Sequence, residues 1–337
     1  MKVSVVILNF NGEDLLQQFL PSVVKHSHSE DVEVFVVDNC STDDSLQILE
    51  QYPEVKLIAL PENYGFAKGY NVALQQIDAK YALLLNSDVE VSEKWLQPMI
   101  ELLETNAEIA ACQPKILSFK DSRYFEYAGA CGGFIDRYGY PFCRGRLSKT
   151  TEKDCGQYDN SIPVFWASGA CLCIRLSDFK QCGGFDERFF AHMEEIDLCW
   201  RLQLLGKQLF CCPQSVVKHV GAATLQNNSR KLYLNFRNNL LMLYKNLPLR
   251  QMKRVFAMRW FLDYLAMFQF LLKGEMSNAK AVFRARKDFS AMRKEYGAVR
   301  AFVQKNALDK SIKTIYPHSI LLETYLWRKK SFNDLKF

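Results

Sequence analysis

The chain has 337 residues, of which 49% are hydrophobic and 24% are charged, and its net charge is +6. This composition is close to the average of globular proteins, so it excludes a disordered chain and does not suggest an integral membrane protein. The length allows one large domain or two ordinary ones, and either provides ample apolar surface for a core.

The charge is unevenly divided along the chain. Residues 245–337 hold 20 Lys and Arg against 7 Asp and Glu, a net charge of +13, whereas residues 1–244 carry a net charge of −7. A basic region of this kind favours contact with a polyanion, either an anionic membrane surface or a nucleic acid.

The cysteines and the N-terminus both suggest a cytoplasmic protein. Eleven cysteines lie between Cys40 and Cys212, and none forms a CxxC pair of the kind used in zinc or redox sites. We expect most of them to be buried thiols in a reducing compartment. Lys2 is followed by a short apolar run without a small-residue cleavage site, which predicts a strand and not a signal peptide.

Four short apolar segments in the first ninety residues are separated by segments with helical spacing. This alternation predicts a parallel sheet covered by helices on both faces, which binds ligands at the carboxyl ends of its strands. The predicted strands are residues 3–10, 32–39, 55–60 and 81–88. Asn11, Asp38 and Asp88 lie at these strand ends.

The pattern is less regular in the second half of the chain. A helix is predicted near residues 95–103, and an irregular stretch rich in Gly, Tyr and Phe follows at about 112–163. A strand at 166–176 and a helix at 194–206 come next. From Ser229 the spacing is helical nearly to the end.

Two turn segments have the residues to contact a nucleotide. Asp38 ends a strand in FVVDNCSTDDS (35–45), where its carboxylate can accept hydrogen bonds from a base or ribose, or can cap the next helix. PENYGFAKGYN (61–71) places two glycines at a strand-to-helix turn, so its backbone can approach an anion at the helix N-terminus. A turn without a ligand is the alternative for the second segment.

Acidic residues form two further candidate sites. In LLLNSDVEV (83–91), a buried strand stops at Asp88 and Glu90 follows two residues later, on the same side if the strand continues. A hard divalent cation bound to a diphosphate prefers such carboxylates, although a strand end with two solvated acids is the alternative. Glu194 and Glu195 open a predicted helix beside two phenylalanines, where a carboxylate can be tuned to act as a base.

Together these segments resemble a family 2 glycosyltransferase with the GT-A fold, and they are similar to rhamnosyltransferase-like enzymes of bacterial polysaccharide synthesis. The resemblance covers about residues 1–250. It rests on seven segments in the order of the family: VVILNFNG, VVDNCSTDDS, NYGFAKGYN, LLLNSDVEV, SGACLCIR, FDERFFAHMEEIDLCWR and KHVGAAT.

The resemblance implies an α/β fold in which residues 1–245 form a GT-A catalytic domain, with a Rossmann-like, mostly parallel sheet and helices on both faces. Residues 246–337 would form a basic helical C-terminal region. The implied activity is the transfer of a sugar, with inversion, from a nucleotide diphosphate sugar to a hydroxyl of a saccharide or lipid-linked saccharide acceptor. A divalent cation, Mg²⁺ or Mn²⁺, would assist.

The resemblance also implies roles for individual residues. The residues implied to contact the donor are Asn9, Asn11, Asp38, Asn63, Gly65, Asn71 and Ser87. The implied metal ligand is Asp88, helped by His219 and Glu90, and the implied base is Glu195, with Glu194 as the alternative. The residues expected to face the acceptor are Trp166, Ser168, Gly169 and Asp197.

Two residues depart from the pattern of the family. Asn86 replaces the first acid of the usual Asp-x-Asp metal motif, so metal binding has to rely on Asp88, Glu90, His219 and the donor phosphates. At the position of the base the family usually has Asp, whereas Glu195 is one methylene longer.

The C-terminal region contains a strongly apolar segment at residues 253–273, interrupted by Arg259 and Asp263, which are one helical turn apart and can pair. From Trp260 to Leu272 there are only 13 residues, which is too short to span a bilayer. We expect it to dock on anionic lipid at the cytoplasmic face of the inner membrane, or else to form a helical subdomain or dimer contact.

Two other functions remain as alternatives. A sugar nucleotidyltransferase would share the alternating sheet, but VVILNFNGEDL lacks the glycine-rich, arginine-containing loop expected after its first strand. A nucleic-acid-binding protein would use the basic C-terminal region, but that region has no recognition motif and the acidic remainder would repel phosphate. We therefore expect no nucleic-acid partner.

Overall fold

The first four strands form the parallel sheet that the sequence predicts. The computed structural model describes residues 2–27, 29–148, 150–221, 229–308 and 311–337. Their order across the sheet is β3-β2-β1-β4, and all three pairings are parallel. These strands and the helices that connect them are β1 (Val3–Asn9), α1 (Glu13–Ser27), β2 (Val32–Asp38), α2 (Ser45–Leu49), β3 (Lys56–Ala59), α3 (Gly65–Gln76) and β4 (Tyr81–Asn86).

Beyond β4 the nine-stranded sheet is mixed. β12 (Cys171–Arg175) lies between β4 and β6 (Ile109–Ser118) and runs antiparallel to both. β13 (Gln208–His219) is parallel to β6, and its end pairs antiparallel with β5 (Val89–Val91). β11 (Ile162–Pro163) forms the edge. The antiparallel β12 brings residues 168–170 next to the carboxyl end of β4, because Asn86 donates a backbone hydrogen bond to the carbonyl oxygen of Ala170.

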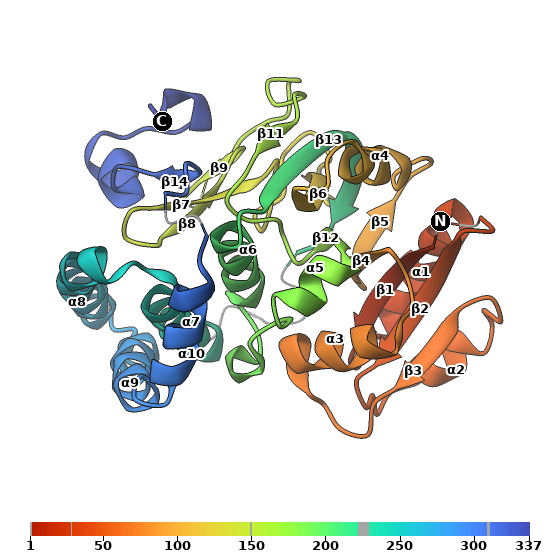
Figure 1. Ribbon diagram of the computed structural model, residues 1–337, viewed down its shortest axis with the longest axis horizontal. Helices are drawn as coiled ribbons and strands as arrows, with labels where there is room; N and C mark the ends of the chain where they lie inside the picture. The colour runs from red at the N-terminus through yellow and green to blue at the C-terminus, as the bar shows by residue number, and fades with distance from the viewer. Residues whose placement is uncertain (1, 28, 149, 222–228, 309–310) are drawn as a thin grey trace.

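A second, five-stranded sheet has the order β10-β9-β8-β7-β14. Its strands are β7 (Gly133–Asp136), β8 (Pro141–Cys143), β9 (Arg146–Leu147), β10 (Thr150–Thr151) and β14 (Ile315–Tyr316). Four of these come from the irregular stretch at 112–163, whereas β14 comes from the C-terminal region and pairs in parallel with β7. Figure 1 shows this sheet at the upper left, beside the C-terminus.

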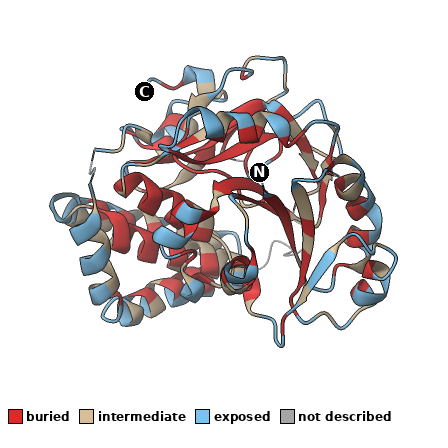
Figure 2. Cartoon of the chain, turned by 45° about the vertical axis from the view of Figure 1, so that its right-hand side comes forward, coloured by how far each residue is buried: buried red, intermediate tan, exposed pale blue. Residues whose placement is uncertain are grey.

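Two apolar clusters hold the main sheet, one on each face, and the buried residues follow the strands in Figure 2. One cluster packs α1 and α4 (Gln97–Thr105) against the sheet and includes Trp95. The other packs α3, α5 (Leu176–Gln181) and α6 (Glu194–Leu204), includes Trp200, and continues into the second sheet. The covered sheet therefore leaves its strand ends as the place for ligands.

Four helices gather at the lower left of Figure 1: α7 (Ser229–Asn246), α8 (Leu249–Leu272), α9 (Met276–Met292) and α10 (Tyr296–Asn306). The buried residues of α8 are Val255, Arg259 and Asp263, which form one stripe along the helix. The predicted pair is confirmed, with Arg259 Nε 3.2 Å from Asp263 Oδ1. Arg286 of α9 also contacts Asp263, at 2.6 Å. These charges attach α8 to its neighbours.

The length expected for the apolar segment was wrong. Helix α8 continues through Arg259 and Asp263 for 24 residues, and within the described chain it is the one helix long and apolar enough to cross a membrane. Only 17% of its most apolar 18-residue window is buried. Because its charged stripe packs against the protein, most of its apolar face is exposed.

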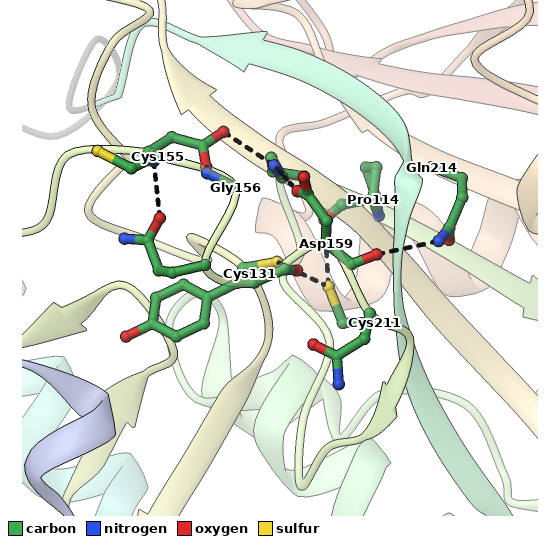
Figure 3. A network of polar contacts seen from close by, with 12 residues as sticks. Pro114, Cys131, Cys155, Gly156, Asp159, Cys211 and Gln214 are labelled. Atoms are coloured by element: carbon green, nitrogen blue, oxygen red, sulfur yellow. Dashed lines mark hydrogen bonds and ion pairs between the residues drawn. The ribbon is translucent and has the colours of Figure 1, made fainter.

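Most of the cysteines are buried, as expected. Cys40 and Cys155 are exposed, Cys182 is intermediate, the others are buried, and all eleven are free thiols. The Sγ atoms of Cys131 and Cys211 lie 3.5 Å apart in the interior, as Figure 3 shows. Burial raises the pKa of the Cys211 thiol, and its hydrogen bond to Cys131 raises it further. The two thiols are therefore a packed, hydrogen-bonded contact of the core.

Candidate active site

The ends of β1 and β2 are joined by polar side chains. Asn9 Nδ2 lies 3.4 Å from Asp38 Oδ1 and 3.3 Å from Ser41 Oγ, and the backbone N–H of Ser41 donates to Asp38 Oδ2 at 3.0 Å. Asn9 Oδ1 is buried and has no hydrogen-bond partner among the described residues. A Cβ on Gly12 would lie 2.4 Å from this oxygen, so only glycine fits there. The end of β1 thus presents an unpaired hydrogen-bond acceptor, Asn9 Oδ1, next to the glycine backbone at Gly12.

Asn11 closes the loop after β1 onto the loop after β2. Its Oδ1 accepts hydrogen bonds from the backbone N–H of Thr42 at 2.8 Å and from the Thr42 hydroxyl at 3.3 Å. Its φ of 49° is one that asparagine adopts more readily than most residues. Asn11 is exposed, so the joined loops form an accessible rim above Asp38.

The start of α3 is organised by Asn39, which the sequence reading did not single out. Asn39 Nδ2 donates to Asn63 Oδ1 at 3.0 Å, and that oxygen also accepts from the backbone N–H of Gly65 at 2.9 Å. Gly65 has a φ of +71° and lies against Phe190, whose ring a Cβ would meet at 2.6 Å. Asn39 follows Asp38 directly, so its position in the motif was the signal available.

Asn71 has a different role from the one expected beside the diphosphate. Its Nδ2 donates to the carbonyl oxygen of Phe185 at 2.9 Å and to Glu187 Oε1 at 3.1 Å, while its Oδ1 accepts from the Phe185 N–H at 2.9 Å. The side chain is also buried. The prediction for Asn71 was therefore wrong, because its amide fastens α3 to the segment that leads into α6.

Asp88 and His219 face each other at the end of β4. His219 Nε2 lies 3.0 Å from Asp88 Oδ1, its Nδ1 lies 3.5 Å from Glu126 Oε2, and all three side chains are buried. Burial lowers the pKa of His219, but the hydrogen bonds and charges of the two carboxylates outweigh it and raise the pKa to about 10. Glu126 gave no signal in the sequence, because it lies in the irregular stretch.

Ser87 lies beside the strand-end cluster, while Glu90 lies apart from it. The hydroxyl oxygen of Ser87 would be 3.8 Å from a Cβ on Gly12. Glu90 forms an ion pair with Lys218 of the adjacent strand at 2.7 Å. Strand β4 ends at Asn86 and a turn separates it from β5, so the premise of a continuing strand was wrong. Nothing in its recorded contacts brings Glu90 to Asp88.

The two glutamates lie at the N-terminus of α6. Oε2 of Glu194 and Oε2 of Glu195 are both buried and make no hydrogen bond to a described residue. Burial raises the pKa of Glu195 to about 7, although nearby backbone N–H groups partly oppose this. Burial and the charge of Glu195 raise the pKa of Glu194 well above its ordinary value. A carboxylate that titrates near neutrality suits a general base.

The backbone before these glutamates is strained. Phe190, His192 and Met193 have φ values of 65°, 69° and 71°, and residues other than glycine rarely adopt such values. Each such residue costs about 1–3 kcal/mol, and this kind of strain clusters at functional sites. The Phe190 carbonyl oxygen accepts hydrogen bonds from the N–H groups of Phe66 and Ala67, at 2.9 and 3.3 Å. The strained turn thus joins the start of α3 to the start of α6.

Gly169 is the one predicted acceptor residue that lies beside Glu195. A Cβ on Gly169 would be 3.2 Å from Phe66 and 3.9 Å from Cβ of Glu195. The side chain of Trp166 is buried and donates to the Phe134 carbonyl oxygen at 3.0 Å. The Ser168 hydroxyl is buried and donates to the Ala128 carbonyl oxygen at 2.7 Å. The prediction that these two side chains face the acceptor was wrong.

Asp197 is a structural residue as well. It is fully buried, and its carboxylate contacts Arg201 at 2.8 Å, Lys245 at 2.7 Å and Asn246 at 2.8 Å. Burial raises its pKa, but the two cations outweigh this and lower it. The prediction for Asp197 was wrong, because a carboxylate enclosed by these partners has no face left for a ligand.

These contacts connect the candidate residues along one edge of the sheet. The end of β4, which leads to Asp88, is hydrogen-bonded to Ala170, and the neighbouring Gly169 lies beside Glu195. Phe66 links the glycine turn of α3 to the same Gly169. The glycine turn of α3, the end of β4 that leads to the acid–histidine pair, and the glutamates are therefore linked along this edge. Residues 222–224 of the KHVGAAT motif lie outside the described residues.

The sequence of this edge matches a known family. A family model described as "Glycosyl transferase family 2" matches residues 4–161, which include the loops after β1 and β2, the glycine turn and Asp88. Residues 4–161 therefore form a family 2 glycosyltransferase domain. This assignment favours glycosyl transfer over the nucleotidyl transfer that would share the alternating sheet.

Curated relatives of this glycosyltransferase match over about two thirds of its length. The N-acetylglucosaminyl-diphospho-decaprenol L-rhamnosyltransferase of Mycobacterium tuberculosis is 28% identical, over 64% of this chain and 75% of that protein. Rhamnosyltransferase WbbL of Escherichia coli is 26% identical, over 63% of this chain and 80% of that protein. The chain spans only 18% of O-antigen biosynthesis protein RfbC of Myxococcus xanthus, with 28% identity over 66% of this chain.

Solved structures share the fold of the glycosyltransferase. GalNAc-T7, crystallised with UDP, GalNAc and Mn²⁺, has a TM-score of 0.60 and 17% identity, over 88% of this chain and 56% of its own. Staphylococcus aureus TarS 1–349, in complex with UDP-GlcNAc, has a TM-score of 0.57 and 19% identity, over 91% and 89%. These similarities confirm the predicted α/β fold of the GT-A type.

Proposed function

We propose that this glycosyltransferase inverts the anomeric carbon of a sugar as it moves it from a nucleotide diphosphate sugar to a hydroxyl of a saccharide acceptor, with Glu195 as the base. One observation carries the proposal: a carboxylate with a pKa of about 7 and an unused oxygen stands beside Gly169, on the edge that also holds the donor loops.

The proposed donor site uses the ends of β1, β2 and β4. Asp38, Asn9 and Asn11 would hold the nucleoside, because they supply acceptors and an amide around the open backbone of Gly12. Asn63 and Gly65 would lie nearer the diphosphate, since they begin α3 and a helix N-terminus favours anions. Ser87 would complete the site from β4.

The side chains present fit a divalent cation, provided that the donor supplies most of the ligands. No group of three or more His, Cys, Asp or Glu able to hold a metal occurs among the described residues, so Asp88 would be the main protein ligand, and His219 would join it only in its neutral form. Mg²⁺ and Mn²⁺ accept few protein ligands alongside phosphate oxygens and water. A bound cation would offset negative charge on the departing nucleotide diphosphate.

In the proposed reaction the residues of this chain position the acceptor and move one proton. Ionised Glu195 takes the proton of the acceptor hydroxyl as its oxygen bonds to the anomeric carbon. The bond from that carbon to the diphosphate oxygen breaks on the opposite face, and the nucleotide diphosphate leaves with the electron pair. This single displacement inverts the anomeric configuration.

A thermal-shift screen tests donor and metal use together. We expect a nucleotide sugar with Mn²⁺ to raise Tm of the full chain, because a ligand of the native state stabilises it by mass action. Asp88→Asn should remove the part of the shift that depends on Mn²⁺, while Glu90→Gln, the matched control, should keep it. An equal Mn²⁺-dependent shift in Asp88→Asn would contradict the metal assignment.

We also propose that the acceptor is carried by a lipid at the cytoplasmic face of an anionic membrane, in the synthesis of a cell-surface polysaccharide. The name of the mycobacterial relative specifies a diphospho-decaprenol acceptor. In this chain, α8 exposes Trp260, Phe261, Leu265 and Phe268, and Arg250, Lys253 and Arg254 are exposed at its start. Residues 1–245 would perform the chemistry, and residues 246–337 would dock the enzyme.

Vesicle co-sedimentation measures this docking. We expect the chain to bind phosphatidylglycerol vesicles about tenfold more tightly than phosphatidylcholine vesicles, since each basic residue near an anionic surface contributes about 1 kcal/mol. Phe261→Ser with Phe268→Ser should lower binding to both. Leu46→Ser and Leu57→Ser, exposed apolar residues of the catalytic part, serve as controls. Equal affinity for vesicles with and without anionic lipid would contradict the proposal.

A further inference from the structure

A groove of about 710 Å³ lies outside the candidate active site, between the second sheet and the C-terminal region. Leu147 and Thr150 line it from β9 and β10, Leu272 and Lys273 from the end of α8, and Tyr325 from the helical turn Leu322–Leu326. The Ser148 hydroxyl donates to the Tyr325 hydroxyl at 3.4 Å, so the two walls are in contact at one end. The groove is therefore a feature of the folded second sheet.

The groove is cationic. Lys273, Arg328, Lys329 and Lys330 line it, and its described lining contains no Asp or Glu. Lys329 is neutralised by Glu323 at 2.5 Å, but the ion pairs recorded in the described chain include none for the other three cations. Three charges without an internal partner favour an anion with several oxygens, such as a diphosphate.

The rim of the groove is apolar and exposed. Leu272 is 72% exposed, Tyr325 68%, Leu326 66% and Trp327 55%. Phe268 continues the same exposed side of α8, one turn before Leu272. Tyrosine and tryptophan beside basic residues are typical of protein surfaces at the boundary of a bilayer. A phosphate in water would gain nothing from this rim, whereas a phosphate attached to a lipid would.

We propose that this groove binds the diphosphate of the lipid-linked acceptor while its rim contacts the bilayer. The inference rests on the proposed function, because it names how that acceptor is held. Lys273 and Arg328 would contact the diphosphate oxygens, and Leu272 and Trp327 would contact the lipid chain where it enters the membrane.

The groove is connected to the catalytic edge through β9. Arg146 precedes the groove residue Leu147, and its Nε donates to the carbonyl oxygen of Tyr127 at 2.9 Å. Tyr127 adjoins Glu126, the residue that contacts His219. The saccharide of an acceptor held in the groove could therefore extend along the second sheet toward Asp88 and Glu195.

The charges disfavour a second copy of the chain as the occupant. A twofold contact places the same patch of both subunits together, so the groove cations of one copy would face those of the other. An anionic lipid surface matches the same charges without repulsion.

The test is a titration of the full chain, followed by tryptophan fluorescence or calorimetry, with farnesyl diphosphate, farnesol and inorganic pyrophosphate. We expect farnesyl diphosphate to bind at least about tenfold more tightly than either other probe, because only it supplies both charge and apolar surface. The double variant Lys273→Gln with Arg328→Gln should bind farnesyl diphosphate about 30-fold more weakly than the wild type, because two charge-assisted contacts are lost. Lys25→Gln, an exposed lysine on α1, is the control and should change nothing.

Each other outcome has a defined meaning. Equal binding of pyrophosphate and farnesyl diphosphate, or unchanged binding in the double variant, would overturn the proposal in favour of a free anion or another site. A dimer in sedimentation velocity that the double variant dissociates would assign the groove to a second copy. The Mn²⁺-dependent shift with nucleotide sugars should be the same in the double variant, so failure of the groove is distinguishable from failure of the proposed donor chemistry.

Discussion

Glu195→Gln is expected to lower kcat for sugar transfer by about 10²–10⁴-fold, the usual contribution of a positioned base. Glutamine keeps the size of the side chain and its place beside Gly169, but its amide cannot accept the proton of an acceptor hydroxyl. Donor binding should survive, because the proposed donor site lies at the ends of β1, β2 and β4 and not on α6. Transfer to acceptor and the thermal shift with nucleotide sugar are measured on the same preparation.

Glu194→Gln is the matched control for this prediction. The two glutamates are adjacent in α6, both have an unpartnered buried oxygen, and burial raises both pKa values. We assign the base to Glu195 because Gly169 lies beside it, so Glu194→Gln should retain most of the activity. If Glu194→Gln loses transfer and Glu195→Gln keeps it, the assignment is reversed.

The pH profile gives an independent check on the same residue. The pKa of Glu195 is raised to about 7, so the carboxylate is protonated and inactive below that pH and ionised above it. Transfer by the wild type should therefore rise as the pH increases through about 7 and then level off. The residual activity of Glu195→Gln should lack this rise, and an unchanged rise would point to a different titrating group.

Asp197→Ala should destabilise the chain by about 3–5 kcal/mol, because buried Arg201 loses its carboxylate partner and buried Lys245 keeps only its ion pair with Asp186. Lys245 and Arg201 both contact the Asp197 carboxylate, and all three side chains are buried. The substitution also removes the acceptor of Asn246. The free energy of unfolding is measured by urea denaturation followed by fluorescence.

An exposed ion pair provides the control for Asp197. Lys56 and Glu33 lie 2.6 Å apart but are about half and one third exposed, so Glu33→Ala should cost only about 0–1 kcal/mol.

The pKa of Asp197 is lowered from 3.8, so its stabilisation is present above that pH and is lost as the pH falls through its folded value. The free energies of unfolding of the wild type and of Asp197→Ala should therefore become equal in acid. Equal unfolding midpoints of these two proteins at neutral pH would refute the structural role of Asp197.

The first part of the fold was predictable because its signals are local. The strands β1 to β4 are short apolar segments that end in polar turns, so the position of Asp38 and Asp88 at strand ends followed from the pattern. The helix at α6 was predictable for the same reason. The antiparallel β12 was not, because its apolar residues carry no information about direction.

The errors at the site came from contacts between distant residues. Asp197 looked like a third acid of a cluster, but its partner Lys245 is 48 positions later and no local spacing indicates that contact. Trp166 and Asn71 are satisfied by backbone groups of Phe134 and Phe185, which are equally remote. The sequence gives the type of each side chain, but it does not show whether that side chain points to solvent or into the fold.

The pairing of β7 with β14 has a consequence for how the chain is made. Ile135 pairs with Ile315, so roughly 180 residues must be synthesised between the two halves of this contact. At about 5–20 residues per second, the ribosome needs on the order of 10–40 s to deliver the second partner. Strands β1 to β4 can therefore assemble during translation, whereas the sheet beside them stays incomplete until Ile315 has been synthesised. A nascent enzyme would be able to hold a donor before it could receive an acceptor.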